Sequence, residues 1–230
     1  MSFKRIAPVL AVLLTLGAGS AQAIDTGARQ AILIEYETGD VLYSKAADEV
    51  MYPASMTKMM TVYMLFERLK NGSLSLEDTF SVSEYAWRKG GSKMFVKVND
   101  RVKVEELIRG IVVQSGNDAT IVVAEGLAGS EEAFAEQMTR KARELGMNQT
   151  TFRNASGWPD SEHVTSAADL AKLAIATIRN FPEYYHYYSE LSYTYNEIKQ
   201  SNRNPVLYQN IGADGLKTGH TEASGYGLTA

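Results

Sequence analysis

One stretch decides the fold we expect for this chain: Pro53-Ala54-Ser55-Met56-Thr57-Lys58-Met59-Met60-Thr61-Val62-Tyr63-Met64-Leu65-Phe66. Read as a helix, it is apolar on almost every side after Lys58, and a helix without a polar face belongs inside a domain. Ser55 and Lys58 interrupt this pattern three residues apart, so their side chains share one face of the helix. The sequence therefore predicts a buried central helix that carries a serine and a lysine near its start.

The pair indicates nucleophilic chemistry. Burial favours the neutral form of a lysine amine, and a neutral amine beside a serine hydroxyl is a base beside a nucleophile. The helix N-terminus also favours negative charge that develops nearby. A second interpretation stays open at this point, because Ser-x-x-Lys alone is a weak motif. Under that interpretation Ser55 is a helix cap and Lys58 is a solvated surface residue.

Composition narrows the function classes. The chain has 230 residues, 45% of them hydrophobic and 22% charged, which is ordinary for one or two globular domains. It has no cysteine, which excludes disulfides and thiolate chemistry. Its three histidines, at positions 163, 186 and 220, lack the spacing of metal ligands, so we expect no metal site and no cofactor. The net charge of −4 gives no basic face for nucleic acid.

Residues 1–23 have the pattern of a secretory signal peptide. Lys4 and Arg5 precede an apolar run over residues 6–16, and Ala21-Gln22-Ala23 is a small-x-small cleavage pattern. A retained N-terminal anchor is the alternative. Residues 24–230 are then the exported catalytic domain, and the absence of cysteine favours a bacterial periplasm or cell envelope.

The remaining pattern predicts a mixed α/β domain. It begins with a β-hairpin (residues 31–36 and 41–43), followed by the central helix, which ends at Asn71-Gly72. Residues 73–100 are expected to be irregular. Further helices are expected over residues 104–113, 119–127, 131–145 and 167–179, a polar loop over 150–164, an aromatic packing segment over 184–195, and strands over 215–220 and 226–230.

Two further motifs follow the first. Ser115-Gly116-Asn117 lies between two predicted helices, and Lys217-Thr218-Gly219 lies on a predicted strand. By themselves, Ser115 and Asn117 are better explained as helix caps. However, the order Ser-x-x-Lys, Ser-x-Asn, Lys-Thr-Gly is the signature of penicillin-interacting serine enzymes. The three motifs together are far more specific than any one of them.

The sequence resembles the low-molecular-mass penicillin-binding proteins, in particular the D-alanyl-D-alanine carboxypeptidases (peptidase family S11). Besides the three motifs, the resemblance includes Gly90-Gly91-Ser92, Asn202-Arg203-Asn204 and Asp214-Gly215-Leu216. It implies the DD-peptidase/serine β-lactamase-like fold, a largely antiparallel sheet flanked by helices, with the Ser55-x-x-Lys58 helix at its centre. It also implies removal of the terminal D-alanine from peptidoglycan stem pentapeptides and acylation by β-lactams.

The resemblance implies a role for each site residue. Ser55 is the expected nucleophile, Lys58 its base, and Ser115 the proton relay to the leaving amine. Asn117 is expected to position the substrate amide. Lys217 and Thr218, together with Arg203, are expected to bind the terminal carboxylate. Gly219 lets the substrate backbone approach the strand, and the backbone N–H groups of Ser55 and His220 are expected to form the oxyanion hole.

The chain departs from the family pattern in three places. Gly116 replaces an aspartate, which favours the carboxypeptidase branch. No Glu-x-x-Leu-Asn segment lies between Ser115 and Lys217, so efficient β-lactam hydrolysis is not expected. Family members also continue beyond the strand that follows Lys-Thr-Gly. We therefore expect a domain that lacks a C-terminal strand and helix and has an unpaired sheet edge. Contact with the inner-membrane surface is expected only if a C-terminal anchor exists.

Two alternatives share the same motifs: a D,D-endopeptidase of this fold, and an inactive penicillin-binding-like fragment.

Overall fold

A central buried helix organises the structure, a computed structural model that describes residues 26–230. The predicted signal peptide lies outside the described residues. A short 3-10 helix, η1 (Ala54–Thr57), leads directly into α1 (Lys58–Lys70), and ten of the 13 residues of α1 are buried. The prediction of a buried central helix is therefore confirmed. Its end at Asn71 and Gly72 is also confirmed, because Asn71 is the C-cap and Gly72 has a φ of +75°.

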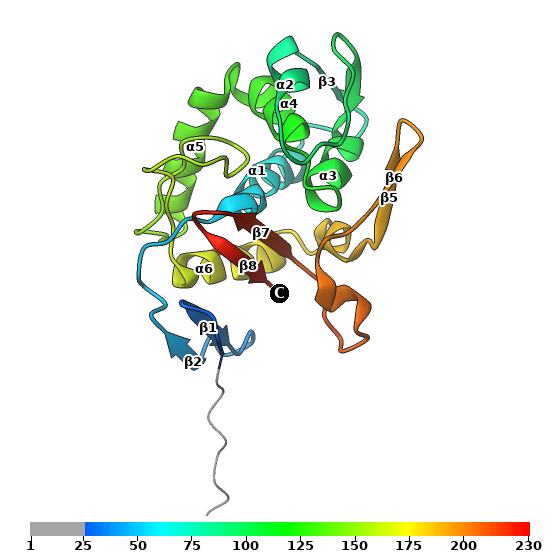
Figure 1. Ribbon diagram of the computed structural model, residues 1–230. Helices are drawn as coiled ribbons and strands as arrows, with labels where there is room; N and C mark the ends of the chain where they lie inside the picture. The colour runs from blue at the N-terminus through cyan, green and yellow to red at the C-terminus, as the bar shows by residue number, and fades with distance from the viewer. Residues whose placement is uncertain (1–25) are drawn as a thin grey trace, which may run out of the picture.

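The other long helices enclose α1. In Figure 1, α3, α4 and α5 lie on one side of α1, and α6 lies on the other side together with strands β7 and β8. The helix bounds are Glu84–Arg88 (α2), Val104–Val112 (α3), Asn117–Ala128 (α4), Glu131–Glu144 (α5) and Ala167–Asn180 (α6). Ser130 and Ser166 cap α5 and α6 by accepting hydrogen bonds from Ala133 N and Asp169 N. The four long predicted helices are thus confirmed to within two residues at either end.

The strands form four antiparallel pairs within residues 26–230. The pairs are β1 (Ala31–Ile34) with β2 (Val41–Lys45), β3 (Thr79–Ser81) with β4 (Arg101–Lys103), β5 (Ser192–Tyr195) with β6 (Ile198–Ser201), and β7 (Lys217–Thr221) with β8 (Gly225–Thr229). The mixed α/β class, the predicted N-terminal hairpin and the two predicted C-terminal strands are confirmed. The expected antiparallel sheet is present only as these separate two-stranded pairs. In particular, β1 and β8 do not pair with each other.

The segment over residues 73–100 is more regular than we expected. It contains β3 and also α2, whose N-cap Ser83 accepts a hydrogen bond from Ala86 N. The prediction of an irregular segment was wrong here because a three-residue strand and a five-residue helix are too short to show a period. The rest of the segment is held by a buried carboxylate. Asp118 accepts hydrogen bonds from the backbone N–H groups of Met94, Phe95 and Val96.

The aromatic segment packs onto the central helix. Tyr187 and Tyr188, in the short helix η2 (Tyr185–Ser189), are buried, and their rings lie against Phe66 of α1 with centroid distances of 6.3 Å each. This confirms the packing interpretation of the tyrosines. A third 3-10 helix, η3 (Pro205–Tyr208), precedes β7. Within residues 26–230, none of the helices combines the length and apolarity needed to cross a bilayer.

Candidate active site

Ser55 lies in η1 and lines a cavity. Neither η1 nor α1 has a side-chain cap, so Ser55 is not the capping residue that the alternative interpretation required. Lys58 is fully buried, and its Nζ atom lies 2.8 Å from Ser55 Oγ. A lysine that cannot reach water and touches a half-buried serine is the arrangement that a base and a nucleophile need.

Lys58 has two further polar contacts, both to acceptors. Its Nζ atom lies 2.8 Å from Asn117 Oδ1 and 3.0 Å from the carbonyl oxygen of Ser156. The Asn117 amide is oriented by its other end, because Nδ2 donates to the carbonyl oxygen of Gly90 at 2.9 Å. A neutral amine has two N–H groups and one lone pair. Asn117 and Ser156 take the two N–H groups, so the lone pair faces the hydroxyl of Ser55.

The surroundings of Lys58 favour this neutral amine. Burial lowers the pKa of Lys58 well below its usual value, and the positive charges of Lys217 and Arg203 lower it further. The negative charge of Asp118 opposes them only in part. These surroundings therefore shift Lys58 towards the neutral amine, the form that can accept a proton.

The second motif closes the site from the α3–α4 connection. Ser115 is buried in the left-handed conformation, with a φ of +57°, and Asn117 is the first residue of α4. The N-cap of α4 is Gly116, without a side-chain cap, so Ser115 and Asn117 do not act as caps. Instead, the Asn117 side chain joins Lys58 to the Gly90-Gly91 loop.

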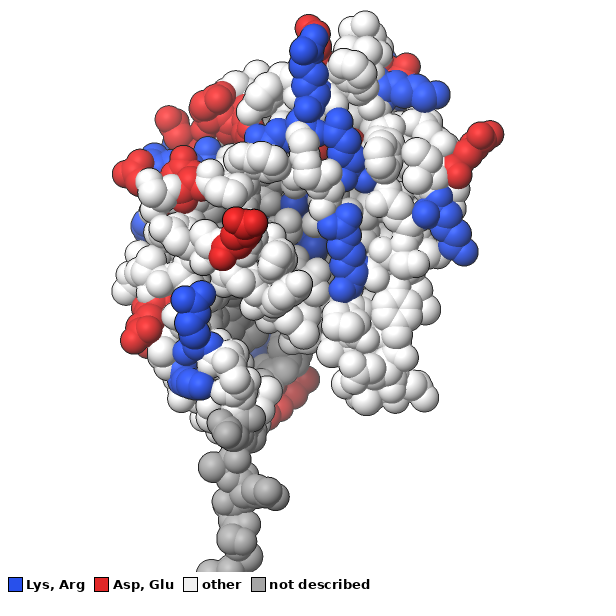
Figure 2. All heavy atoms as spheres, in the orientation of Figure 1, with Lys and Arg blue, Asp and Glu red and all other residues white. Residues whose placement is uncertain are grey.

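The third motif brings positive charge to the same place. Lys217, at the start of β7, is 3% exposed, and burial together with the charge of Arg203 lowers its pKa to about 7. Its Nζ atom donates to the carbonyl oxygen of Thr218 at 3.0 Å. Arg203 reaches across to the Gly90-Gly91-Ser92 loop and donates to Ser92 Oγ. On the face shown in Figure 2, lysine and arginine side chains gather around a hollow in the middle.

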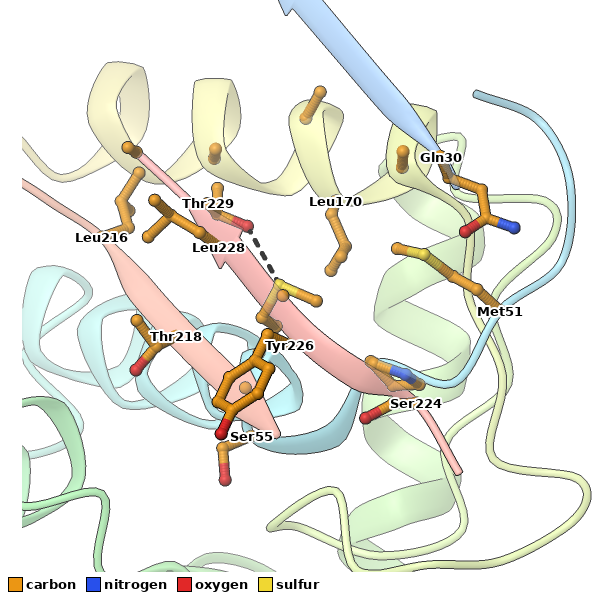
Figure 3. Close-up of a pocket in the computed structure, with 18 of the residues that line it drawn as sticks. Gln30, Met51, Ser55, Leu170, Leu216, Thr218, Ser224, Tyr226, Leu228 and Thr229 are labelled. Carbon is orange, nitrogen blue, oxygen red and sulfur yellow. Dashed lines mark hydrogen bonds between the residues drawn. The ribbon is translucent and has the colours of Figure 1, made fainter. Parts of the chain in front are cut away.

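Strand β7 lies directly against the serine turn. A Cβ atom at Gly219 would lie 2.8 Å from the carbonyl oxygen of Pro53 and 3.1 Å from the backbone nitrogen of Ser55. Only glycine therefore permits this approach. The next residue, His220, is exposed, and its ring stacks on Tyr226 of β8 at 4.1 Å. Figure 3 shows Thr218 on β7 and Tyr226 on β8, with Ser55 on the turn beside these two strands.

One cavity of about 1600 Å³ joins these residues. Among the expected site residues, its lining includes Ser55, Ser115, Arg203, Thr218, Gly219 and His220. Lys58, Asn117 and Lys217 lie buried beneath the lining. The cavity continues between β1, α6 and β8, where Leu170 of α6 lies near β8 (Figure 3). Within residues 26–230, the structure shows no hydrogen bond from the Ser115 side chain to Lys58 or Lys217, although Ser115 lines the same cavity as Ser55.

Three groups that hold the site residues in place were not predicted from the sequence. The Ser156 carbonyl oxygen contacts Lys58, the Gly90 carbonyl oxygen orients Asn117, and Ser92 holds Arg203. Ser156 and Ser92 do belong to loops that stand out in the sequence, Ser156-Gly157-Trp158-Pro159 and Gly90-Gly91-Ser92. The two carbonyl contacts could not be predicted from the sequence, because they are made by backbone atoms and not by a particular side chain. Within the described part of the chain, no three His, Asp or Glu side chains cluster to hold a metal ion.

Comparisons with known proteins agree with this geometry. Residues 18–230 match the family described as D-alanyl-D-alanine carboxypeptidase, Peptidase_S11. The chain is 41% identical to the D-alanyl-D-alanine carboxypeptidase DacA of Haemophilus influenzae over 203 residues, which are 86% of this chain and 52% of that protein. It is 30% identical to a D-alanyl-D-alanine endopeptidase of the same organism, over 87% of this chain and 69% of that protein. The chain thus spans about half the length of the curated carboxypeptidases that it matches.

Solved structures show the same fold. Penicillin-binding protein 5 from Haemophilus influenzae superposes with a TM-score of 0.86 at 39% identity, over 89% of this chain and 61% of that chain. Penicillin-binding protein D2 from Listeria monocytogenes, in an ampicillin-bound form, superposes with a TM-score of 0.79 at 30% identity, over 89% of this chain and 84% of that chain. The expected DD-peptidase fold is therefore confirmed.

Proposed function

Since this chain belongs to the D-alanyl-D-alanine carboxypeptidase family, peptidase S11, we propose that it is a serine-type D,D-carboxypeptidase. It removes the terminal D-alanine from peptidoglycan stem pentapeptides through an acyl-enzyme. The observation that carries this proposal is the 2.8 Å contact between Ser55 Oγ and the fully buried Lys58 Nζ.

Acylation begins at Ser55. The neutral amine of Lys58 accepts the hydroxyl proton while Ser55 Oγ forms a bond to the carbonyl carbon of the penultimate D-alanine. The oxygen of that carbonyl becomes negative in the tetrahedral intermediate. The backbone N–H groups of Ser55 and His220 stabilise it, an arrangement supported by the close approach of β7 to the serine turn.

Collapse of the intermediate releases D-alanine. The C–N bond breaks, and the leaving nitrogen receives a proton through the Ser115 hydroxyl, which lines the same cavity as Ser55. Asn117 aligns the scissile amide while it holds Lys58. Water then hydrolyses the Ser55 ester, with Lys58 again as the base.

The substrate carboxylate is bound by the positive groups at β7. Burial and the positive charge of Arg203 lower the pKa of Lys217, and a bound carboxylate relieves the repulsion between these two cations. Thr218 supplies a hydroxyl in the same cavity. β-Lactams carry a carboxylate beside an acylating amide, so we expect them to acylate Ser55 as substrate analogues.

The proposal is tested with purified protein, fluorescent penicillin and a stem pentapeptide. We expect one stable adduct on Ser55 by intact mass and peptide mapping, together with release of free D-alanine from the pentapeptide. Ser55→Ala should abolish both, while the matched control Ser44→Ala, on the exposed face of β2, should leave both unchanged. An adduct that persists in Ser55→Ala would contradict the assignment.

A D,D-endopeptidase is the second candidate function, and the 30% identity to a named endopeptidase favours keeping it. The two activities differ in the leaving group, which is free D-alanine in one case and a cross-linked side chain in the other. Release of disaccharide-peptide monomers from cross-linked dimers, without release of D-alanine from pentapeptide, would identify the endopeptidase. A folded protein with neither activity and no adduct would be the inactive fragment.

We also propose that residues 1–23 direct export and that residues 24–230 act in the bacterial periplasm. The support is the signal-peptide pattern and the match to bacterial cell-wall enzymes. Cell fractionation with N-terminal sequencing of the mature protein tests this, and an N-terminus at Ile24 is expected.

A further inference from the structure

A buried histidine lies behind the serine turn. His163, in the loop before α6, is 2% exposed, and its ring meets the edge of Phe152 at 5.5 Å. Its Nδ1 atom lies 3.1 Å from the backbone N–H of Arg153, which can only donate. Nδ1 is therefore the unprotonated acceptor, and the proton of the neutral ring is on Nε2. Nε2 lies 2.8 Å from Thr57 Oγ1 and donates to it.

The two partners of His163 belong to the two segments that hold Lys58. Thr57 lies in η1, between Ser55 and Lys58. Arg153 begins the segment over residues 153–157, which includes Ser156, and the Ser156 carbonyl oxygen lies 3.0 Å from Lys58 Nζ. The imidazole ring thus fixes the separation between the serine turn and the segment over residues 153–157.

Two further contacts show how closely this segment lies against the helix. The carbonyl oxygen of Ala155 accepts from Thr61 Oγ1 of α1 at 2.7 Å. At Gly157, which has a φ of +80°, a Cβ atom would lie 1.7 Å from the carbonyl oxygen of Ala54. A small displacement of the segment would therefore change the contact between the Ser156 carbonyl oxygen and Lys58 Nζ.

The ring is held in its neutral form. Burial lowers the pKa of His163 to about 4, and the positive charge of Arg153 acts in the same direction, while the negative charge of Asp160 opposes both. The other elements packed on the ring present Thr57 and Phe152, which are uncharged. A protonated ring would place an N–H group against the N–H of Arg153, so protonation and this contact exclude each other.

We propose that His163 is a positioning residue for the lysine base: it clamps the Ser156 carbonyl against Lys58 and so keeps the amine lone pair directed at Ser55. Without the clamp, one N–H of Lys58 loses its acceptor and the amine is free to rotate. The inference rests on the proposed acylation of Ser55, and it adds a residue that has no contact with substrate.

The kinetic test compares two replacements at this position. His163→Gln keeps an acceptor for Arg153 N and a donor for Thr57, whereas His163→Leu keeps neither. We expect the rate constant for acylation by penicillin to fall about tenfold or more in His163→Leu and to stay within about threefold of wild type in His163→Gln. The constant for initial non-covalent binding should be unchanged in both. His186→Leu, at an exposed histidine, is the matched control and should acylate normally.

Thr57→Val removes the same hydrogen bond from the other side without changing the histidine. It should slow acylation to a similar extent, also without a change in initial binding. Wild-type acylation rates in Thr57→Val or His163→Leu would overturn the inference. An equal loss in His163→Gln and His163→Leu would overturn it too, because packing alone would then explain the effect.

A readout that needs no activity separates this inference from the proposed function. In ¹⁵N spectra, with the signals assigned by the loss of one histidine in His163→Gln, we expect the Nε2–H tautomer of His163 between pH 5 and pH 8. The Nδ1–H tautomer, or a charged ring in that range, would overturn the clamp even if Ser55 reacts. Absence of any penicillin adduct in wild type would overturn the proposed function, and with it the role of the clamp in acylation.

Discussion

Lys58 Nζ and Ser55 Oγ lie 2.8 Å apart at the start of a buried helix, and the other two contacts of the amine are both to oxygen acceptors. This geometry leaves the amine lone pair for the serine proton. The relationship depends on burial as much as on distance, because in water the amine would be protonated and would make the same contact as a donor.

The first prediction concerns the base. Lys58→Ala should slow acylation of Ser55 by fluorescent penicillin by about 100-fold or more, since a positioned base typically contributes about 10²–10⁴ to the rate. Stopped-flow or time-resolved mass measurements give the rate constant. The control is Lys199→Ala, which removes an exposed lysine of β6 and should acylate like wild type. An unchanged rate in Lys58→Ala would remove Lys58 as the base.

The second prediction concerns stability and pH. The folded-state pKa of Lys217 is lowered to about 7, whereas the unfolded chain has the ordinary lysine value of 10.5. Between these values the unfolded state binds more protons, so the free energy of unfolding should rise with pH from about 7 towards 10.5. The slope from this one group is at most about 1.4 kcal/mol per pH unit. Urea unfolding at pH 7, 8 and 9 measures it.

Lys217→Met supplies the comparison for that slope, because it keeps a long side chain without a titrating group. It should be more stable than wild type at pH 7, and its stability should rise less steeply with pH. The lowered pKa of Lys58 acts in the same direction and remains in this variant. Equal slopes in the two proteins would show that Lys217 is not held with a lowered pKa.

The third prediction concerns the approach of β7 to the serine turn. Gly219→Ala places a methyl group 2.8 Å from the Pro53 carbonyl oxygen and must push the two segments apart. Because the displaced atoms include the backbone of Ser55, acylation should fall by about tenfold to 100-fold. Gly27→Ala is the matched control, since its added methyl group meets nothing within 4 Å. Normal acylation by Gly219→Ala would argue against a close backbone contact at this point.

The fourth prediction concerns the buried carboxylate of Asp118. It accepts hydrogen bonds from three consecutive backbone N–H groups, those of Met94, Phe95 and Val96, and an amide in its place would turn a donor towards at least one of them. Asp118→Asn should therefore lower the free energy of unfolding by about 2 kcal/mol or more. Urea denaturation measures the loss, with the exposed Asp40→Asn as the control. A loss below about 0.5 kcal/mol would contradict this account of the segment.

Much of the fold was predictable because the long elements carry strong periodic signals. The apolar run after Lys58 predicted the buried helix, and the predicted helix starts at residues 131 and 167 are confirmed by the structure. The short elements β3 and α2 were not predicted, since they span less than two helical turns or a few strand residues. The sequence also did not predict that the strands form separate pairs, because the choice of pairing partner leaves no pattern in the local sequence.

By itself the sequence determined the buried helix, the order of the three motifs and the family to which the chain belongs. These are carried by side-chain identity and spacing along the chain. Tertiary structure alone decided how Lys58 is held: the Ser156 carbonyl oxygen, the Gly90 carbonyl oxygen behind Asn117, and the histidine behind Thr57. The physical reason is that carbonyl groups occur at every residue and histidine is often structural, so only folding shows which of them meet the buried amine.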